Sequence, residues 1–241
     1  MNFLYKIPGY ILVISGGFFL SWGGFVVRLF ETTDPWGILF LRSFFFFIAV
    51  TFFLYLTYKK ETLNIIKKAG YAGLIGGFIM SLSFVAFVFA MLNTSVANVV
   101  FIISTQTMFL ALFGYFYLNE KISAISFASI ILATSGIIIM IGDSFNEGTL
   151  FGNLVALVIP ICFSVLVMVV RKNSNLDMVP AVWYASIFSI LYGVLMTNTF
   201  SFSYNDILMG SLLGIPQLTF GFVCITIGSR TTTSATIGLL M

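Results

Sequence analysis

Residues 7–27 read IPGYILVISGGFFLSWGGFVV, an apolar run that contains no charged side chain. The hydrocarbon core of a bilayer is about 30 Å thick, and a helix crosses it with about 20 mainly apolar residues. The run is longer than the apolar part of a secretory signal peptide and lacks a small-residue cleavage site. We therefore interpret it as a membrane span that the protein retains.

The rest of the chain has the same character. Hydrophobic residues make up 60% of the 241 residues and charged residues only 8%, a composition outside the range of soluble domains. Apolar runs follow one another with short polar breaks, which predicts an all-α integral membrane protein. The expected spans are 7–28, 35–58, 69–91, 95–118, 122–142, 150–170, 178–197 and 207–227, with a ninth that begins near Thr232 and stops at Met241.

Basic residues lie almost entirely on one side of these spans. When successive loops are assigned to alternating sides of the membrane, Arg28 is the only span-flanking basic residue on the side opposite the N-terminus. The other flanking basic residues share the N-terminal side: Lys6, Lys59, Lys60, Lys67, Lys68, Lys121, Arg171, Lys172 and Arg230. Cytoplasmic loops carry the excess of Lys and Arg. The pattern therefore predicts a protein of the cell inner membrane with a cytoplasmic N-terminus.

Two short segments suggest an internal repeat. Residues 90–99 read AMLNTSVANV and residues 228–237 read GSRTTTSATI, with Ser95 and Thr233 at an offset of 138 residues. Spans three and four then match spans eight and nine, so the repeat unit has five helices. Because five is odd, the second unit enters the membrane from the opposite face, as in many secondary transporters.

The repeat predicts two domains, 1–142 with spans one to five and 143–241 with spans six to nine. A complete pair of five-helix units has ten spans, of which about eight and a half are present. The second unit would end about 40 residues beyond Met241, and a helix that stops inside an apolar run lacks a polar flank. We therefore expect the chain to be a C-terminally truncated fragment.

Several motifs resemble one known family. Residues 93–142 open with Thr-Ser-x-Ala-Asn, continue through an apolar helix to Leu-Asn-Glu-Lys at 118–121, and end in a helix that finishes with small residues and Gly. Together with Ser-Trp-Gly-Gly at 21–24 and Arg42, this segment resembles the EamA-type repeat of the drug/metabolite transporter superfamily. The resemblance implies ten spans, a central site between the repeats and alternating access. It differs in one place, because Ser-Thr-Gln-Thr at 104–107 replaces a mid-span proline common in that family.

Arg42 is the strongest single candidate for a substrate-binding residue. An ionised side chain inside a span is costly unless it faces a cavity or a partner. A guanidinium suits a carboxylate or a phosphate, so Arg42 is expected to bind such a group of the substrate or to line the outer vestibule. The alternative is a structural link to helix-end carbonyls, to Glu31 or to Asp34.

Four further residues complete the candidate site. Asn98 and Gln106 lie about two helical turns apart on the fourth span and are expected near the cavity, although polar side chains also join helices by hydrogen bonds. Trp22 is a candidate for stacking on a substrate ring, with packing or lipid contact as the alternative. Gln217 follows Pro216 in the eighth span, where a proline frees backbone groups to meet a substrate.

The chain lacks the usual groups of an enzyme. It contains no histidine, and no paired carboxylate or acidic residue falls inside an expected span, so acid/base catalysis and metal ligation are not expected. We predict a transporter of a small polar metabolite, such as an amino acid or a nucleotide-like compound, without cofactor, metal or nucleic acid. The expected partners are the substrate, the lipid bilayer and a second copy in a homodimer. A non-transporting membrane scaffold or subunit is the alternative.

Overall fold

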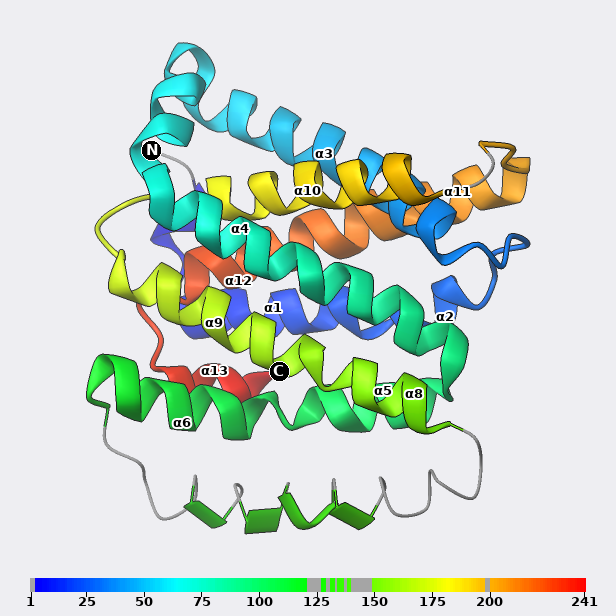
Figure 1. The fold of residues 1–241 in the computed structure, drawn as a ribbon. Helices are drawn as coiled ribbons and strands as arrows, with labels where there is room; N and C mark the ends of the chain where they lie inside the picture. Colours follow the sequence, from blue (N-terminus) through cyan, green and yellow to red (C-terminus); the bar gives the residue numbers. More distant parts are fainter. Residues whose placement is uncertain are drawn as a thin grey trace.

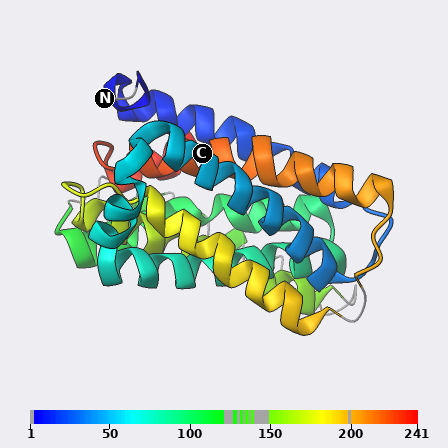
Figure 2. The ribbon, with the colours of Figure 1, turned by 90° about the horizontal axis from the view of Figure 1, so that it is seen from above.

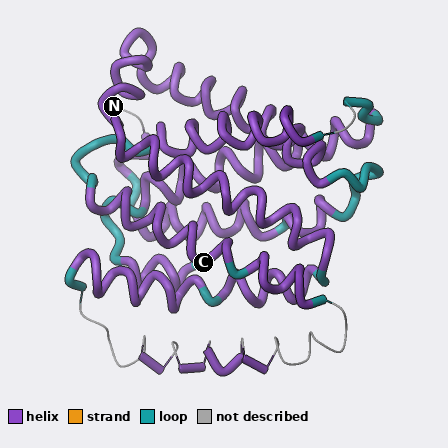
Figure 3. Tube along the Cα trace, viewed as in Figure 1, coloured by secondary structure: helices purple, strands orange, loops and turns teal. Residues whose placement is uncertain are grey.

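The computed structural model describes residues 3–120, 127–128, 131–132, 134–136, 138–139, 149–197 and 200–241. Within these ranges every regular element is a helix, and none is a strand (Figure 3). The expected fifth span, 122–142, falls mostly outside the described residues. The all-α prediction is therefore confirmed for the described part of the chain.

The first helix is interrupted in the middle of its apolar run. Helix α1 (Gly9–Ser21) ends at Trp22, whose φ and ψ are −92° and 1°, and α2 (Gly23–Val27) follows at once. Helix α3 (Pro35–Tyr58) begins after Asp34, whose carboxylate accepts hydrogen bonds from the backbone N–H groups of Trp36 and Gly37. Such a cap satisfies donors that the first helical turn leaves free.

The next helices complete the first half of the described chain. The chain reverses at Lys59, which has a φ of 49°, and passes through the short η2 (Lys59–Glu61) into α4 (Thr62–Asn93). Helix α4 is kinked at Gly70, whose φ and ψ are 52° and −147°. A further interruption separates α5 (Val96–Ser104) from α6 (Gln106–Leu118). Helix α6 ends at Asn119, which adopts the left-handed conformation common at helix C-termini.

The second half of the chain is also helical. In chain order its described elements are α8 (Leu150–Ala156), α9 (Val158–Lys172), α10 (Val179–Met196), α11 (Tyr204–Leu212), the π-helix η3 (Leu213–Phe220), α12 (Gly221–Gly228) and α13 (Ser234–Leu240). Proline explains two interruptions. Pro160 has no N–H for the carbonyl of Ala156, next to the break at Leu157. Pro216 lies inside the π-helix.

Six helical runs of the described residues are long and apolar enough to cross a membrane: Gly9–Val27, Pro35–Asn93, Val96–Leu118, Leu150–Lys172, Val179–Met196 and Tyr204–Gly228. The 59-residue run Pro35–Asn93 contains both α3 and α4, which correspond to the expected spans 35–58 and 69–91. Each of the six runs therefore coincides with one or two expected spans.

Helices from the two halves interleave. Helix α10 packs along both α3 and α4, α9 packs on α4 and α6, and α12 packs on α1 (Figures 1 and 2). The start of α13 lies beside the end of α6, at the same end of the bundle as the N-terminus, while α2 and α11 lie at the opposite end. The cavity described next is therefore built from both halves of the chain.

Candidate functional site

A cavity of about 240 Å³ lies inside the bundle. Residues of α1 to α6, α9, η3 and α12 all line its wall. The lining residues include Leu20, Ser21 and Gly24 around the α1–α2 break and Ser104 and Gln106 around the α5–α6 break. In membrane proteins, irregular backbone within the hydrocarbon region is tolerated where it faces protein or a water-filled cavity. The cavity thus lies where several helices are discontinuous.

Arg42 lines this cavity from α3 and is 1% exposed. Its Nε and Nη1 atoms have no hydrogen-bond partner among the described residues. The guanidinium carbon lies 5.2 Å from the ring centroid of Phe84 and 5.1 Å from that of Phe87, so the charge is held by the faces of two aromatic rings. Glu31 and Asp34 form no ion pair with it in the described structure. Among the described residues, neither of the two ion pairs named in the structural alternative is therefore formed.

Gln106 lines the cavity as the first residue of α6 and is 5% exposed. The helix is interrupted just before it although no proline is present. The hydroxyls of Ser104 and Thr105 donate to the carbonyls of Phe101 and Ile102, each at 2.6 Å. Local side-chain hydrogen bonds of this kind compete with the helical pattern and bend helices. The fourth span is thus interrupted at these two hydroxyl–carbonyl hydrogen bonds, without a mid-span proline.

Gln217 lines the cavity from η3 and is 3% exposed. Its Nε2 donates to the carbonyl of Leu20 at 3.4 Å, and its buried Oε1 has no partner among the described residues. The π-helix widens the turn around Pro216, and the Thr219 hydroxyl donates to the Gly214 carbonyl at 2.9 Å. The π-helix therefore places Gln217 on the cavity wall, with an amide oxygen that has no partner in the described structure.

Trp22 and Asn98 are not among the residues that line the cavity. Trp22 is half-buried at the α1–α2 break and packs against a cluster around Val26, Val27 and Met91. The Asn98 Nδ2 donates to Thr94 Oγ1 at 3.1 Å, and that hydroxyl donates to Asn153 Oδ1 on α8 at 2.7 Å. Asn98 thus belongs to a link between helices, and its role in substrate binding stays a prediction.

The model of the EamA-like transporter family matches residues 7–142, more than half of the chain. The chain belongs to this family. The resemblance drawn from the sequence motifs is confirmed, and this EamA family member is a multi-span membrane protein of a transporter family. Comparison with curated proteins and with solved structures gave no match.

The apolar wall of the cavity in this EamA protein was not predicted from the sequence. Met80, Phe84, Phe87 and Met91 recur at helical spacing on α4, and all four line the cavity. Ser83, which is 2% exposed, lies between them on the same wall. The spacing of i, i+4, i+7 and i+11 was readable as one helix face. However, the chain contains 29 Phe residues, so an apolar helix face that lines a cavity cannot be told from one that packs or faces lipid.

Acidic residues of the EamA protein lie away from the cavity. No carboxylate is among the described residues that line it, and the described part of the chain has no cluster of three His, Cys, Asp or Glu that could hold a metal ion. Cys162 and Cys224 are free and buried. Within the described structure, the wall of the cavity therefore offers one cation, neutral polar groups and apolar side chains.

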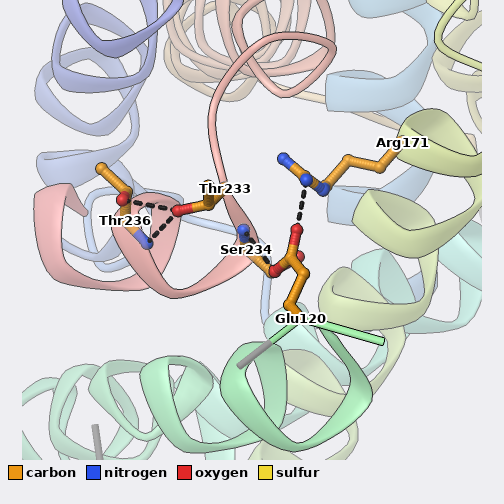
Figure 4. Close-up of polar contacts among 5 residues, drawn as sticks. All are labelled: Glu120, Arg171, Thr233, Ser234 and Thr236. Atoms are coloured by element: carbon orange, nitrogen blue, oxygen red, sulfur yellow. Dashed lines mark hydrogen bonds and ion pairs between the residues drawn. The ribbon is translucent and has the colours of Figure 1, made fainter. Parts of the chain in front are cut away.

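Glu120 connects three helices at the end of the bundle that contains the N-terminus (Figure 4). Its Oε1 accepts a hydrogen bond in an ion pair with Arg171 Nη2 at the end of α9. Its Oε2 accepts the backbone N–H of Ser234, at the start of α13, at 3.1 Å. The Leu-Asn-Glu-Lys motif of the family thus places its carboxylate between α6, α9 and α13.

A second polar cluster lies at the same end. The hydroxyls of Tyr5 and Tyr58 contact each other at 2.8 Å, and both donate to the carboxylate of Asp177. The guanidinium of Arg230 lies 5.7 Å from the ring centroid of Tyr5. Burial, followed by the charge and the hydrogen bond of Asp177, raises the pKa of Tyr5, while Arg230 lowers it in part. The Tyr5 hydroxyl therefore stays protonated at neutral pH.

Proposed function

We propose that this EamA protein carries a small polar metabolite across the membrane by alternating access through the cavity. The observation that carries the proposal is Arg42, a buried cation that faces the cavity and has two nitrogens without hydrogen-bond partners in the described structure. Leaving a charged donor unpaired in a protein interior is costly. A substrate that pairs with Arg42 during part of a transport cycle offsets that cost.

The alternative, a scaffold that only binds partners, requires the polar side chains to serve helix contacts. Asn98 does so, whereas Arg42, Gln106 and Gln217 converge on one cavity from α3, α6 and η3. Secondary transporters typically place their sites at discontinuous helices near the midplane. This arrangement favours transport, with Arg42, Gln106 and Gln217 as substrate-binding residues.

We further propose that the chain contains two inverted five-helix repeats, as part of a ten-span protein. One structural correspondence supports the 138-residue offset. The Ser95 hydroxyl caps α5 by accepting the N–H of Asn98, and the Thr233 hydroxyl caps α13 by accepting the N–H of Thr236. The first spans of the two halves are also both interrupted, at Trp22 and at Leu157.

For orientation, we propose a cytoplasmic N-terminus in the inner membrane. The turn η2 with Lys59 and Lys60, and the end of α9 with Arg171 and Lys172, lie at the same end of the bundle as the N-terminus. An excess of basic residues marks the cytoplasmic side. The homodimer stays a prediction.

Thiol labelling tests transport without knowledge of the substrate. In a Cys162→Ala, Cys224→Ala background, Ser83→Cys places a thiol on the cavity wall, and Ser189→Cys places one on α10 at a buried position outside the cavity. A membrane-impermeant maleimide is applied to one side or the other of oriented vesicles. Alternating access predicts that the Ser83→Cys protein reacts from both sides and that the Ser189→Cys protein reacts from neither.

The result has a clear negative outcome. If the Ser83→Cys protein is labelled from one side only, or is as unreactive as the Ser189→Cys protein, then the cavity does not alternate between the two faces. The scaffold alternative then gains support. Circular dichroism and size-exclusion profiles check that both variants fold like the cysteine-free parent.

A further inference from the structure

We infer that the substrate is an amphipathic monocarboxylate, with its carboxylate on Arg42, an apolar body against α4, and one hydrogen-bond donor directed to Gln217. This inference rests on the proposed function and names the substrate class of the same cavity. Three features of the wall carry it: its charge, its apolar face and its free acceptor.

The charge of the wall selects an anion of low charge. Arg42 is the one cationic residue among the described residues that line the cavity, and no carboxylate lies beside it. An organic cation would meet the Arg42 charge without a counter-ion. A phosphate monoester carries a charge of about −1.5 to −2 at neutral pH and would leave part of that charge unpaired. A carboxylate matches a guanidinium in both charge and planar geometry.

The apolar face selects the body of the ligand. Met80, Phe84, Phe87 and Met91 form a continuous face of α4, and Phe163 and Phe222 add to the lining from α9 and α12. Methionine and aromatic side chains gain stability by covering apolar ligand surface. Phe84 and Phe87 also hold the Arg42 guanidinium, so the anion-binding group and the apolar face are contiguous. A ligand that engages both needs a carboxylate attached to an apolar body.

The free acceptor selects one polar substituent. Because the Gln217 Nε2 already donates to the Leu20 carbonyl, its Oε1 is oriented as an acceptor without a partner in the described structure. A buried acceptor is stabilised by an N–H or O–H group of the ligand. A hydroxyl or amino group near the carboxylate provides that donor.

Thermal-shift measurements on the purified protein test the class with matched probes. The acids are 4-phenylbutanoate, 4-methylpentanoate and indole-3-acetate, and the amines are 4-phenylbutylamine, 4-methylpentylamine and tryptamine. Acetate lacks the apolar body, and phenyl phosphate replaces the carboxylate. A ligand that binds the folded state raises Tm in a saturable way. We expect saturable shifts with at least one of the three acids and none with the amines, acetate or phenyl phosphate.

Two variants assign the contacts. Arg42→Met should lower the affinity for the bound acid at least tenfold, while Arg42→Lys retains part of it. In the wild type, 2-hydroxy-4-phenylbutanoate should bind more tightly than 4-phenylbutanoate, and Gln217→Met should abolish the difference. Loss of binding without loss of folding is verified by an unchanged size-exclusion profile of each variant.

Several outcomes would overturn the inference: no shift with any of the three acids, stronger shifts with an amine or with phenyl phosphate, or full acid affinity in the Arg42→Met protein. If the Gln217→Met protein still binds 2-hydroxy-4-phenylbutanoate more tightly than 4-phenylbutanoate, Gln217 is not part of the site. These failures are distinct from a failure of the proposed function. If the Ser83→Cys protein is labelled from both sides but the wild-type protein binds no acid, transport stands and the substrate class is wrong.

Discussion

Two arginines of this protein meet opposite environments. Arg171, at the end of α9, pairs with Glu120, and the two side chains are 17% and 21% exposed. Arg42, in the middle of the bundle, is 1% exposed and lies between the rings of Phe84 and Phe87 with two nitrogens unpaired in the described structure. Arg171 has a counter-ion within the fold, although its Nε has no hydrogen-bond partner in the described structure, whereas Arg42 has no counter-ion there.

The difference separates a charge that is paired within the fold from one that is not, and it is the unpaired one that we propose for ligand binding. A paired cation at the end of the bundle joins helices and stabilises the folded state by a modest amount. An unpaired cation in the interior destabilises the folded state until a counter-ion arrives. The two arginines should therefore respond with opposite signs to the same substitution.

The largest expected effect comes from replacing each arginine by methionine, an unbranched side chain that is uncharged and shorter than arginine. Arg42→Met removes buried unpaired donors, so the ligand-free protein should gain about 2 kcal/mol of stability. Arg171→Met leaves Glu120 without its counter-ion, so this variant should lose about 1 kcal/mol of stability. Thermal unfolding in detergent measures both. A loss of stability in the Arg42→Met protein would show that its ring contacts outweigh its unpaired nitrogens.

Glu120→Gln should lower stability by about 1–2 kcal/mol, because it removes the ion pair and weakens the contact to the Ser234 N–H. A double-mutant cycle with Arg171→Met isolates the pair. We expect the double variant to be more stable than the sum of the single losses predicts. Strictly additive losses would mean that the pair contributes no coupling energy.

The Tyr5 cluster makes the stability of the folded protein depend on pH. The folded state raises the pKa of Tyr5 above its unfolded value of about 10. The stability that this contributes is complete below about pH 10 and is lost as the pH rises further, because unfolding then releases a proton. Tyr5→Phe should cost about 1 kcal/mol at pH 7 and should flatten the fall in Tm above pH 10. Parallel Tm curves for the two proteins in that range would contradict the assignment.

Asn98→Ala should have the smallest effect. It removes the hydrogen bond to Thr94, at a cost of about 0.5–1 kcal/mol, and should leave the affinity for a bound acid unchanged. Unfolding curves and ligand titrations of the same preparation measure the two quantities. A tenfold loss of affinity would move Asn98 from the helix link to the substrate site.

Much of the fold could be predicted because a bilayer imposes a simple rule on the sequence. Each described candidate span coincides with expected apolar runs, since run length alone sets the span. The interruptions were harder to predict. Pro216 signalled one of them, whereas the break at Thr105 has no proline and coincides with hydroxyls that bond to carbonyls one turn away. Ser and Thr occur in many uninterrupted helices, so their presence does not identify a break.

The candidate site was predictable where burial makes a residue costly. Arg42, Gln106 and Gln217 stood out as large polar groups inside apolar runs, and all three line the cavity. Asn98 gave the same signal but finds partners on neighbouring helices. Which polar groups pair with each other depends on tertiary contacts, and Thr94 and Asn153 are 59 residues apart in the chain. Spacing along one helix could not reveal that link.

Gly23 lies outside the cavity lining but controls its shape. A Cβ at this position would lie 1.9 Å from Gln217 Nε2, so even alanine would force the Gln217 amide, which lines the cavity, to move. The size of the side chain at position 23 therefore affects where the Gln217 amide lies, and with it the space available to a ligand. A relative with alanine or serine at this place would need another position for the end of the side chain at 217, or a smaller side chain there. Selection for a new substrate could thus act on a residue that never touches it.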